Sequence, residues 1–318
     1  MRRADVRRRA VPRREAPWSV DWAAVGAALL LAAAASARAA DGPPAPVFDV
    51  YTAPDGQTLD VEWHLPAGEV QALVTLQHGF ARRCANLRTL ARTLAAAGFA
   101  TLCVNADLAR GAPVLARALA RDLAATSALP DGRALPPDVV AAGHSAGGLF
   151  AAHLAAHLAA HLVAHSPVHS AAHRETQPAT APVPQPTAPT AKQPTAQPAL
   201  RLAGVLLLDP VGGADLAAAL QAVRSTTAPP VLALLAPPSR CNARQMARPV
   251  LEAAAATVID IADGSHLDAE GADAEALAVW SCREGAPRAA AVQRLQDEAL
   301  GFLRAVSARP ASPVPRSP

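Results

Sequence analysis

Ser145 lies in the sequence GHSAGG at positions 143–148, directly after the apolar run Val139–Ala142 and before a stretch of helical composition. A sharp turn from a strand into a helix crowds the neighbours of its central residue, and glycines two positions before and after that residue relieve the crowding. Such a turn raises the serine hydroxyl above the start of a helix, whose dipole favours developing negative charge. The pattern predicts that Ser145 is a nucleophile; an ordinary glycine-rich turn is the alternative.

His266 is the residue that we expect to act as the base. It follows the apolar run Thr257–Ile261, in the sequence ADGSHLD at positions 262–268, and it is the only histidine after the Pro-rich segment 176–198. An imidazole within hydrogen-bond reach of a serine hydroxyl can take its proton and activate the oxygen. A solvated loop histidine is the alternative interpretation.

The acid that would orient this histidine is less obvious. The segment 235–242, which follows the next-to-last apolar run, reads LAPPSRCN and contains no carboxylate, whereas Asp209 ends the run before it. A carboxylate there could fix the tautomer of His266 and stabilise its protonated form, because geometry matters more than chain order. Asp263 and Asp268, which flank the histidine, are substitutes, and capping of the following turn is the alternative role for Asp209.

These residues need a scaffold that brings them together. Short apolar runs predict strands at Val47–Thr52, Thr58–Leu65, Ala72–Gln77, Phe99–Val104, Asp138–Gly143, Ala203–Asp209, Val231–Leu235 and Thr257–Ile261. Helical patterns lie at Cys84–Ala97, Pro113–Ala128, Ala146 to about His165, Asp215–Arg224, Ala243–Ala256 and Ala289–Val306. Strands that alternate with helices predict an α/β fold, here a mostly parallel eight-stranded sheet flanked by helices. Because 51% of the residues are apolar and only 3% aromatic, we expect a core of Leu, Val and Ala.

The sequence resembles the α/β-hydrolase superfamily, in particular its chlorophyllase-type and dienelactone-hydrolase-like serine esterases. Three segments carry the resemblance: GHSAGG, the sequence QHGF at positions 77–80 that ends the third strand, and LDPV at positions 208–211. The resemblance implies the α/β-hydrolase fold, hydrolysis of small-molecule carboxylic esters through an acyl-enzyme, and no cofactor. Chlorophyllases have Arg where this chain has Ala146, so the resemblance does not extend to chlorophyll as the substrate.

The resemblance also implies a set of site residues. They are the catalytic Ser145, Asp209 and His266, with the backbone N–H groups of Phe80 and Ala146 as the oxyanion hole.

The N-terminal residues have the pattern of an export signal. A basic front precedes an apolar run from Ala23 to Ala35, and ARA at positions 37–39 matches the small-x-small cleavage pattern. The run is about 13 residues, fewer than the ~20 that cross a bilayer as a helix. We therefore expect a signal peptide at 1–39, a secreted or periplasmic protein, and no stable membrane anchor; an uncleaved N-terminal anchor is the alternative.

The remaining chain divides by composition. We expect a hydrolase domain in two parts, 40–165 and 200–308, separated by a low-complexity His/Pro/Thr-rich insertion at 166–199 and followed by a disordered tail at 309–318. The segment 1–39 holds eight of the 29 Lys and Arg and three of the 26 Asp and Glu residues, which leaves 21 basic and 23 acidic residues. A net charge of about −2 argues against nucleic acid as a partner. The oligomeric state stays open.

Four cysteines remain after the expected signal: Cys84, Cys103, Cys241 and Cys282. An even number in an exported protein makes disulfides plausible, and four cysteines allow three pairings. Cys241 with Cys282 is the favoured pair, because both fall in loop-like stretches. Cys103 lies in a strand-like run, where a buried free thiol is the alternative.

Histidines recur every four residues at 153, 157, 161, 165, 169 and 173. On a helix this spacing places them on one face, where neighbouring pairs could chelate Zn²⁺, Ni²⁺ or Cu²⁺. No carboxylate or cysteine accompanies them in the sequence, so we predict no metal site. The rival function is nevertheless a non-catalytic, histidine-rich metal-binding protein on a hydrolase fold. A third possibility keeps the enzyme but gives it amides or polyesters as substrates.

Overall fold

The computed structural model describes residues 44–108, 112–164, 200–226 and 228–308. The expected signal peptide 1–39, insertion 166–199 and tail 309–318 lie outside these ranges, as do the last three histidines of the repeat. No helix among the described residues is both long and apolar enough to cross a membrane.

The centre of the fold is one eight-stranded sheet with the strand order β1-β2-β4-β3-β5-β6-β7-β8. The strands are β1 Val47–Thr52, β2 Thr58–His64, β3 Ala72–Gln77, β4 Phe99–Val104, β5 Asp138–His144, β6 Arg201–Leu208, β7 Val231–Leu235 and β8 Thr257–Asp260. Strand β2 pairs antiparallel with β1 and β4, and all other neighbours are parallel. The predicted fold class, a mostly parallel eight-stranded sheet flanked by helices, is confirmed.

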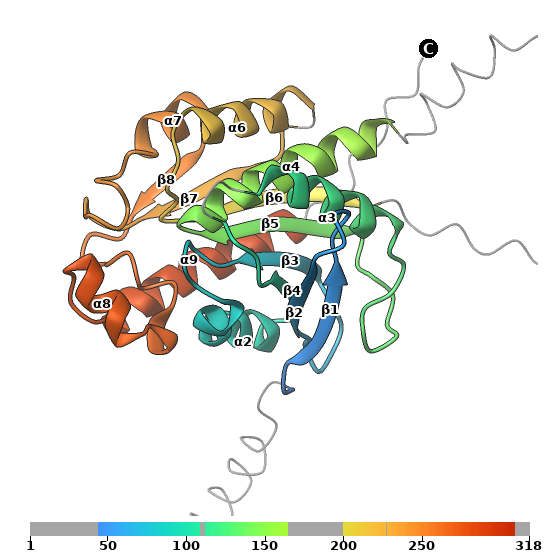
Figure 1. The fold of residues 1–318 in the computed structure, drawn as a ribbon, viewed down its shortest axis with the longest axis horizontal. Helices are drawn as coiled ribbons and strands as arrows, with labels where there is room; N and C mark the ends of the chain where they lie inside the picture. Colours follow the sequence, from blue (N-terminus) through green and yellow to red (C-terminus); the bar gives the residue numbers. More distant parts are fainter. Residues whose placement is uncertain (1–43, 109–111, 165–199, 227, 309–318) are drawn as a thin grey trace, which may run out of the picture. The chain divides into compact units, whose positions relative to one another are not determined.

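Helices cover both faces of this sheet (Figure 1). The helices of the described residues are α2 Arg88–Ala96, α3 Pro113–Ala125, α4 Ala146–Ala164, α6 Ala214–Thr226, α7 Arg248–Ala253, α8 Ala276–Cys282 and α9 Ala289–Ser307, with short 3₁₀ turns at Cys84–Leu87 and Gly271–Asp273. Helices α3, α4, α6 and α7 pack on one face, and α2 and α9 pack on the other. Because parallel strands with helices on both faces are fully buried, they read as unbroken apolar runs.

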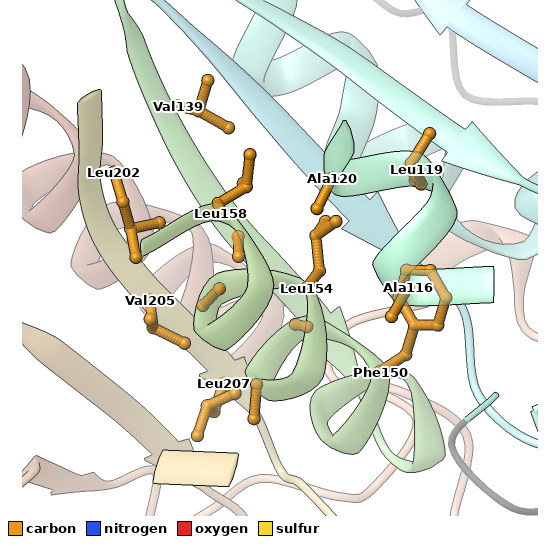
Figure 2. Packing of buried hydrophobic residues seen from close by; sticks show 14 of the residues in the cluster. Ala116, Leu119, Ala120, Val139, Phe150, Leu154, Leu158, Leu202, Val205 and Leu207 are labelled. Carbon is orange, nitrogen blue, oxygen red and sulfur yellow. The ribbon is translucent and has the colours of Figure 1, made fainter. Parts of the chain in front are cut away.

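Leucine and alanine dominate the core, as expected. Ten of the twelve largest fully buried side chains are Leu, and the other two are Phe99 and Phe150. Figure 2 shows α4 over the sheet, with Leu154 and Leu158 among side chains of β5, β6 and α3. Alanines at 151, 152, 155 and 159 of α4 are completely buried. Small side chains at these positions let the helix lie close to the strands that carry the candidate site.

The strand predictions agree closely with the structure. Strands β1, β3, β4 and β7 have the predicted bounds. Strands β2, β5 and β8 differ by one residue at one end, and β6 begins two residues earlier and ends one residue earlier than predicted. The predicted helices at 113–128, 146–165, 215–224 and 289–306 appear as α3, α4, α6 and α9 with small shifts. The segment 84–97 begins as a 3₁₀ turn before α2.

The prediction of a helix over Ala243–Ala256 was wrong, because only Arg248–Ala253 is helical. Ala243, Arg244 and Gln245 have backbone φ angles of 49°, 57° and 59°. L-residues rarely adopt this left-handed conformation, and a right-handed helix cannot pass through it. Tertiary contacts of the preceding residue, described below, override the helical propensity of this Ala-rich segment. Helix α8, which has seven residues, was not predicted.

Candidate active site

The turn between β5 and α4 presents Ser145. Its φ of 56° lies in the left-handed region, where a non-glycine residue is strained and commonly functional. A Cβ on Gly143 would lie 2.0 Å from the carbonyl oxygen of Gly147, and a Cβ on Gly147 would lie 2.3 Å from that of His78. The flanking glycines are therefore required by close backbone approach, which is the physical reason expected from the sequence.

His266 meets Ser145 from the loop after β8. Its Nε2 lies 2.9 Å from Oγ of Ser145, and its Nδ1 lies 2.7 Å from Oδ2 of Asp209. The three residues are buried, with 5%, 9% and 4% of the surface of His266, Ser145 and Asp209 exposed. The structure thus brings together the three side chains that the sequence analysis selected, from loops at the carboxyl ends of β5, β6 and β8.

The hydrogen bonds define the proton positions in this group. A carboxylate only accepts hydrogen bonds, so Nδ1 of His266 donates to Asp209. In a neutral imidazole the other ring nitrogen, Nε2, then carries a lone pair that can accept the hydroxyl hydrogen of Ser145. This arrangement can remove a proton from the serine oxygen when it attacks an electrophile.

Asp209 is held in place by several contacts. Its φ is 43°, so the residue occupies a strained turn directly after β6. The backbone N–H of Asp209 donates to Leu234 at 2.7 Å, and Oδ1 accepts from the backbone N–H of Ala236 at 3.1 Å. Asn242 adds side-chain contacts to both carboxylate oxygens. These contacts orient the carboxylate toward His266, although β6, the strand before Asp209, is not adjacent to β8, the strand before His266.

Two further carboxylates, Asp263 and Asp268, flank His266 in the sequence. Asp268 accepts hydrogen bonds from the backbone N–H of Ser265 at 2.8 Å and from its hydroxyl at 3.1 Å. Burial raises the pKa of Asp268, against these hydrogen bonds. Asp263 is exposed. Asp268 therefore orders the loop that carries His266, and neither residue replaces Asp209 in the contact with Nδ1.

The loop after β3 passes directly over Ser145. A Cβ on Gly79 would lie 3.0 Å from Cβ and 3.4 Å from Oγ of the serine, so only a glycine fits here without displacement. Phe80 and Ala146, the two residues expected to form an oxyanion hole, line the same cavity as Ser145. The side chain of Phe80 is exposed. The structure therefore places the expected oxyanion loop next to the serine.

This cavity has a volume of about 450 Å³. Its apolar lining includes Phe80, Val211 and Leu267, and its charged lining includes Arg82 and Glu270. Nε of Arg82 donates to Oε1 of Glu270 at 2.8 Å. Burial raises the pKa of Glu270, and the charge of Arg82 opposes that rise. The volume lies in the range of small-molecule sites, roughly 300–1,000 Å³.

Sequence reasoning missed two side chains that hold His266. His144, within the GHSAGG motif, donates from Nε2 to the backbone carbonyl of His266 at 2.7 Å, and the two rings lie 4.8 Å apart. Burial, followed by the charge of His266, lowers the pKa of His144 well below its usual range, so this ring is neutral. Glu284 accepts a hydrogen bond from the backbone N–H of His266 at 2.7 Å. The motif made His144 visible, but no local signal indicated its partner.

Two disulfides are present. The favoured pair Cys241–Cys282 is confirmed, and both cysteines line the cavity. The alternative of a free thiol at Cys103 was wrong, because Cys103 is bonded to Cys84 at the start of the 3₁₀ turn before α2. The strand-like surroundings of Cys103 gave no indication of this pairing with a cysteine 19 positions earlier in the chain.

The histidine repeat enters helix α4 as expected. His153, His157 and His161 belong to this helix, and burial lowers the pKa of the first two below the usual value. Among the described residues, no group of three or more His, Cys, Asp or Glu side chains is arranged to hold a metal ion.

Comparisons with known proteins concern the fold. No protein-family model matches the chain, and no curated protein matches it in sequence. Carboxyl esterase 2 from the fungus Tuber melanosporum is similar in structure, with a TM-score of 0.50 and 12% identity over 82% of this chain and 86% of that one. An esterase from Pyrobaculum calidifontis matches with a TM-score of 0.49 and 14% identity over 93% and 96% of the two chains. Dienelactone hydrolase from Anabaena variabilis matches with 0.48 and 17% identity over 82% and 98%. The strand order and the similarity to the Tuber melanosporum structure together show that this chain has the α/β-hydrolase fold.

Proposed function

We propose that the chain is an exported serine hydrolase that cleaves carboxylic esters through an acyl-enzyme intermediate. One observation carries the proposal: His266 lies within hydrogen-bond distance of both Ser145 and Asp209, at a cavity that can hold a small molecule. A serine hydroxyl, an imidazole and a carboxylate in this order form an activated nucleophile on many unrelated folds.

The proposed reaction has two halves. Oγ of Ser145 attacks the ester carbonyl while its proton passes to Nε2 of His266, and Asp209 stabilises the imidazolium that forms. The backbone N–H groups of Phe80 and Ala146 hold the negative oxygen. The bond from carbon to the alcohol oxygen then breaks, and His266 returns the proton to the departing alcohol. Water repeats the sequence on the acyl-enzyme and releases the acid, so no cofactor is required.

The cavity lining suits a small organic ester. The cavity combines apolar walls with a small number of polar side chains, as is typical of sites for small organic molecules. The similar fold of a carboxyl esterase supports the same choice of bond. Both disulfides and the N-terminal signal pattern support export to a secreted or periplasmic location, where disulfides persist.

Labelling with a fluorophosphonate, followed by peptide mapping, tests the nucleophile without knowledge of the natural substrate. We expect the label on the peptide that contains Ser145, and Ser145→Ala should lose both labelling and the hydrolysis of short p-nitrophenyl esters. Ser281 also lines the cavity, and its hydroxyl donates to the backbone of Ala278, so Ser281→Ala should keep the labelling.

Unchanged ester hydrolysis in a folded Ser145→Ala variant would contradict the assignment. Absence of labelling together with stoichiometric Zn²⁺ or Ni²⁺ uptake, lost when His153, His157 and His161 are replaced, would instead favour the metal-binding function.

A further inference from the structure

Asn242 lies next to the candidate site and has none of its surface exposed. Its Oδ1 accepts hydrogen bonds from the backbone N–H groups of Ser239 at 2.8 Å and Gln245 at 3.1 Å. Its Nδ2 lies 2.9 Å from the carbonyl oxygen of Pro237 and 3.1 Å from Oδ2 of Asp209. Donors surround one end of the amide and acceptors surround the other, so the network itself fixes its orientation.

The contact with Asp209 includes both carboxylate oxygens. Nδ2 of Asn242 lies 3.3 Å from Oδ1 in addition to the contact with Oδ2, the oxygen that accepts from His266. A neutral amide donor withdraws charge from the carboxylate and restricts its rotation without adding a competing charge. We propose that Asn242 is a positioning residue. Its amide fixes the orientation of the Asp209 carboxylate toward His266 and moderates the negative charge that the imidazole senses. This inference rests on the proposed function.

The segment that carries Asn242 cannot hold this conformation by itself. The residues after it, Ala243, Arg244 and Gln245, are all in the left-handed region, which is unfavourable for side chains with a Cβ. Such a segment persists only where the surrounding structure restrains it. The Asn242 amide restrains both sides of the turn, and the disulfide of Cys241 to Cys282 restrains the preceding residue. The local backbone is thus organised around one buried amide that points at Asp209.

Removal of the amide changes the charge that His266 senses. Without the Nδ2 donor, more negative charge remains on Asp209, and the protonated form of His266 is favoured. The acid limb of the pH profile of kcat/KM reports the pKa of the base in the free enzyme. Its midpoint should therefore move to higher pH in Asn242→Ala. It should move by a similar amount in Asn242→Leu, which has nearly the same shape as asparagine but no hydrogen-bond donor.

The test measures kcat and KM for a short p-nitrophenyl ester from pH 5 to 9, with fluorophosphonate titration to count active molecules. For Asn242→Ala we expect a fall in kcat on the order of 10-fold, a smaller change in KM, and the upward shift of the acid limb. Ser239→Ala is the matched control: it removes the hydroxyl that accepts from the Asn242 backbone N–H at 3.3 Å but leaves the amide contacts with Asp209. Its pH midpoint should equal that of the wild type.

Two outcomes decide the inference. Midpoints that rise above the wild-type value by similar amounts in Asn242→Ala and Asn242→Leu support it. Wild-type midpoints in both variants, with any loss of rate explained by fewer titratable sites, would overturn it, because a purely structural role changes the amount of active enzyme and not the pKa of His266. If Asn242→Ala does not fold, the nearly isosteric Asn242→Leu variant decides alone. Failure of the proposed function is separate, since in that case the wild type is not labelled at Ser145, or Ser145→Ala retains wild-type activity.

Discussion

The imidazole of His266 and the carboxylate of Asp209 meet at 2.7 Å although 57 positions separate them and an intervening strand, β7, lies between the strands that precede them. The contact is possible because β6, β7 and β8 are parallel neighbours whose carboxyl ends lie at one edge of the sheet. The loop after β7 contributes the backbone N–H of Ala236 and the amide of Asn242 to the same carboxylate. The loop after β7 therefore holds in place a carboxylate, Asp209, that comes from the end of the neighbouring strand β6.

Replacement of this acid should affect the rate far more than the fold. Asp209→Asn keeps the shape but presents an amide to Nδ1, which favours the wrong tautomer of His266. We expect kcat to fall by about 10⁴-fold, by analogy with other triads. Measurement of kcat on p-nitrophenyl esters checks this, with the exposed Asp263→Asn as the control that should keep wild-type rates. A large loss in the control and a small one in Asp209→Asn would reverse the assignment.

The residues around the contact between His266 and Asp209 illustrate what the sequence could predict. Ser145 and His266 stand in short motifs after apolar runs, so local pattern alone was sufficient to select them. Asp209 was selected because the loop after β7 has no carboxylate, whereas the apolar run before it ends in one. Asn242 and Glu284 were not found, because their contacts depend on segments that are distant in sequence. Patterns identify residues at strand ends, but they do not show which loops fold back over them.

The same limit applies to the secondary structure. The bounds of β3 and β4 were predicted because strands that are buried along their whole length read as mostly apolar runs in the sequence. The segment 243–256 has good helical propensity, yet its first residues are left-handed. The buried amide of Asn242 accepts hydrogen bonds from both sides of that turn, and no periodicity of the sequence reports these contacts.

Gly147 is expected to tolerate no side chain. A methyl group there would lie 2.3 Å from the carbonyl oxygen of His78 and 2.4 Å from that of Gln77, both backbone atoms. Gly147→Ala should therefore lower the free energy of unfolding by about 2–3 kcal/mol, as overpacking does, and displace the loop over Ser145. Denaturant unfolding and fluorophosphonate labelling measure the two effects.

Gly301 provides the contrast. It is exposed within α9, and a Cβ there meets no atom within 4 Å. Gly301→Ala should raise the free energy of unfolding by about 0.5–1 kcal/mol, because alanine is the better helix former, and leave labelling unchanged. Equal effects of the two substitutions would contradict the steric argument.

The two disulfides should separate stability from catalysis. Loop closure over 41 residues for Cys241–Cys282 and 19 for Cys84–Cys103 corresponds to about 4 and about 3 kcal/mol of stabilisation. Both double serine variants should therefore unfold at lower denaturant concentration. Only loss of Cys241–Cys282 should also lower kcat, because that disulfide lines the cavity and precedes Asn242. A lower kcat per titratable site in the Cys84→Ser/Cys103→Ser variant alone would contradict this division.

Stability at acid pH should depend on Glu62, a buried carboxylate on β2. Burial alone would raise its pKa, but hydrogen bonds from His64 and Arg88 outweigh burial and lower the pKa from 4.5 to about 2. Because the folded state binds this proton less readily than the unfolded state, the stabilisation is complete above about pH 4.5 and is lost as the pH falls toward 2. Thermal unfolding midpoints over this window should fall more steeply for the wild type than for Glu62→Gln. Replacement of the exposed Glu69 by Gln should keep the wild-type slope, and identical slopes in all three proteins would show that Glu62 is not the group responsible.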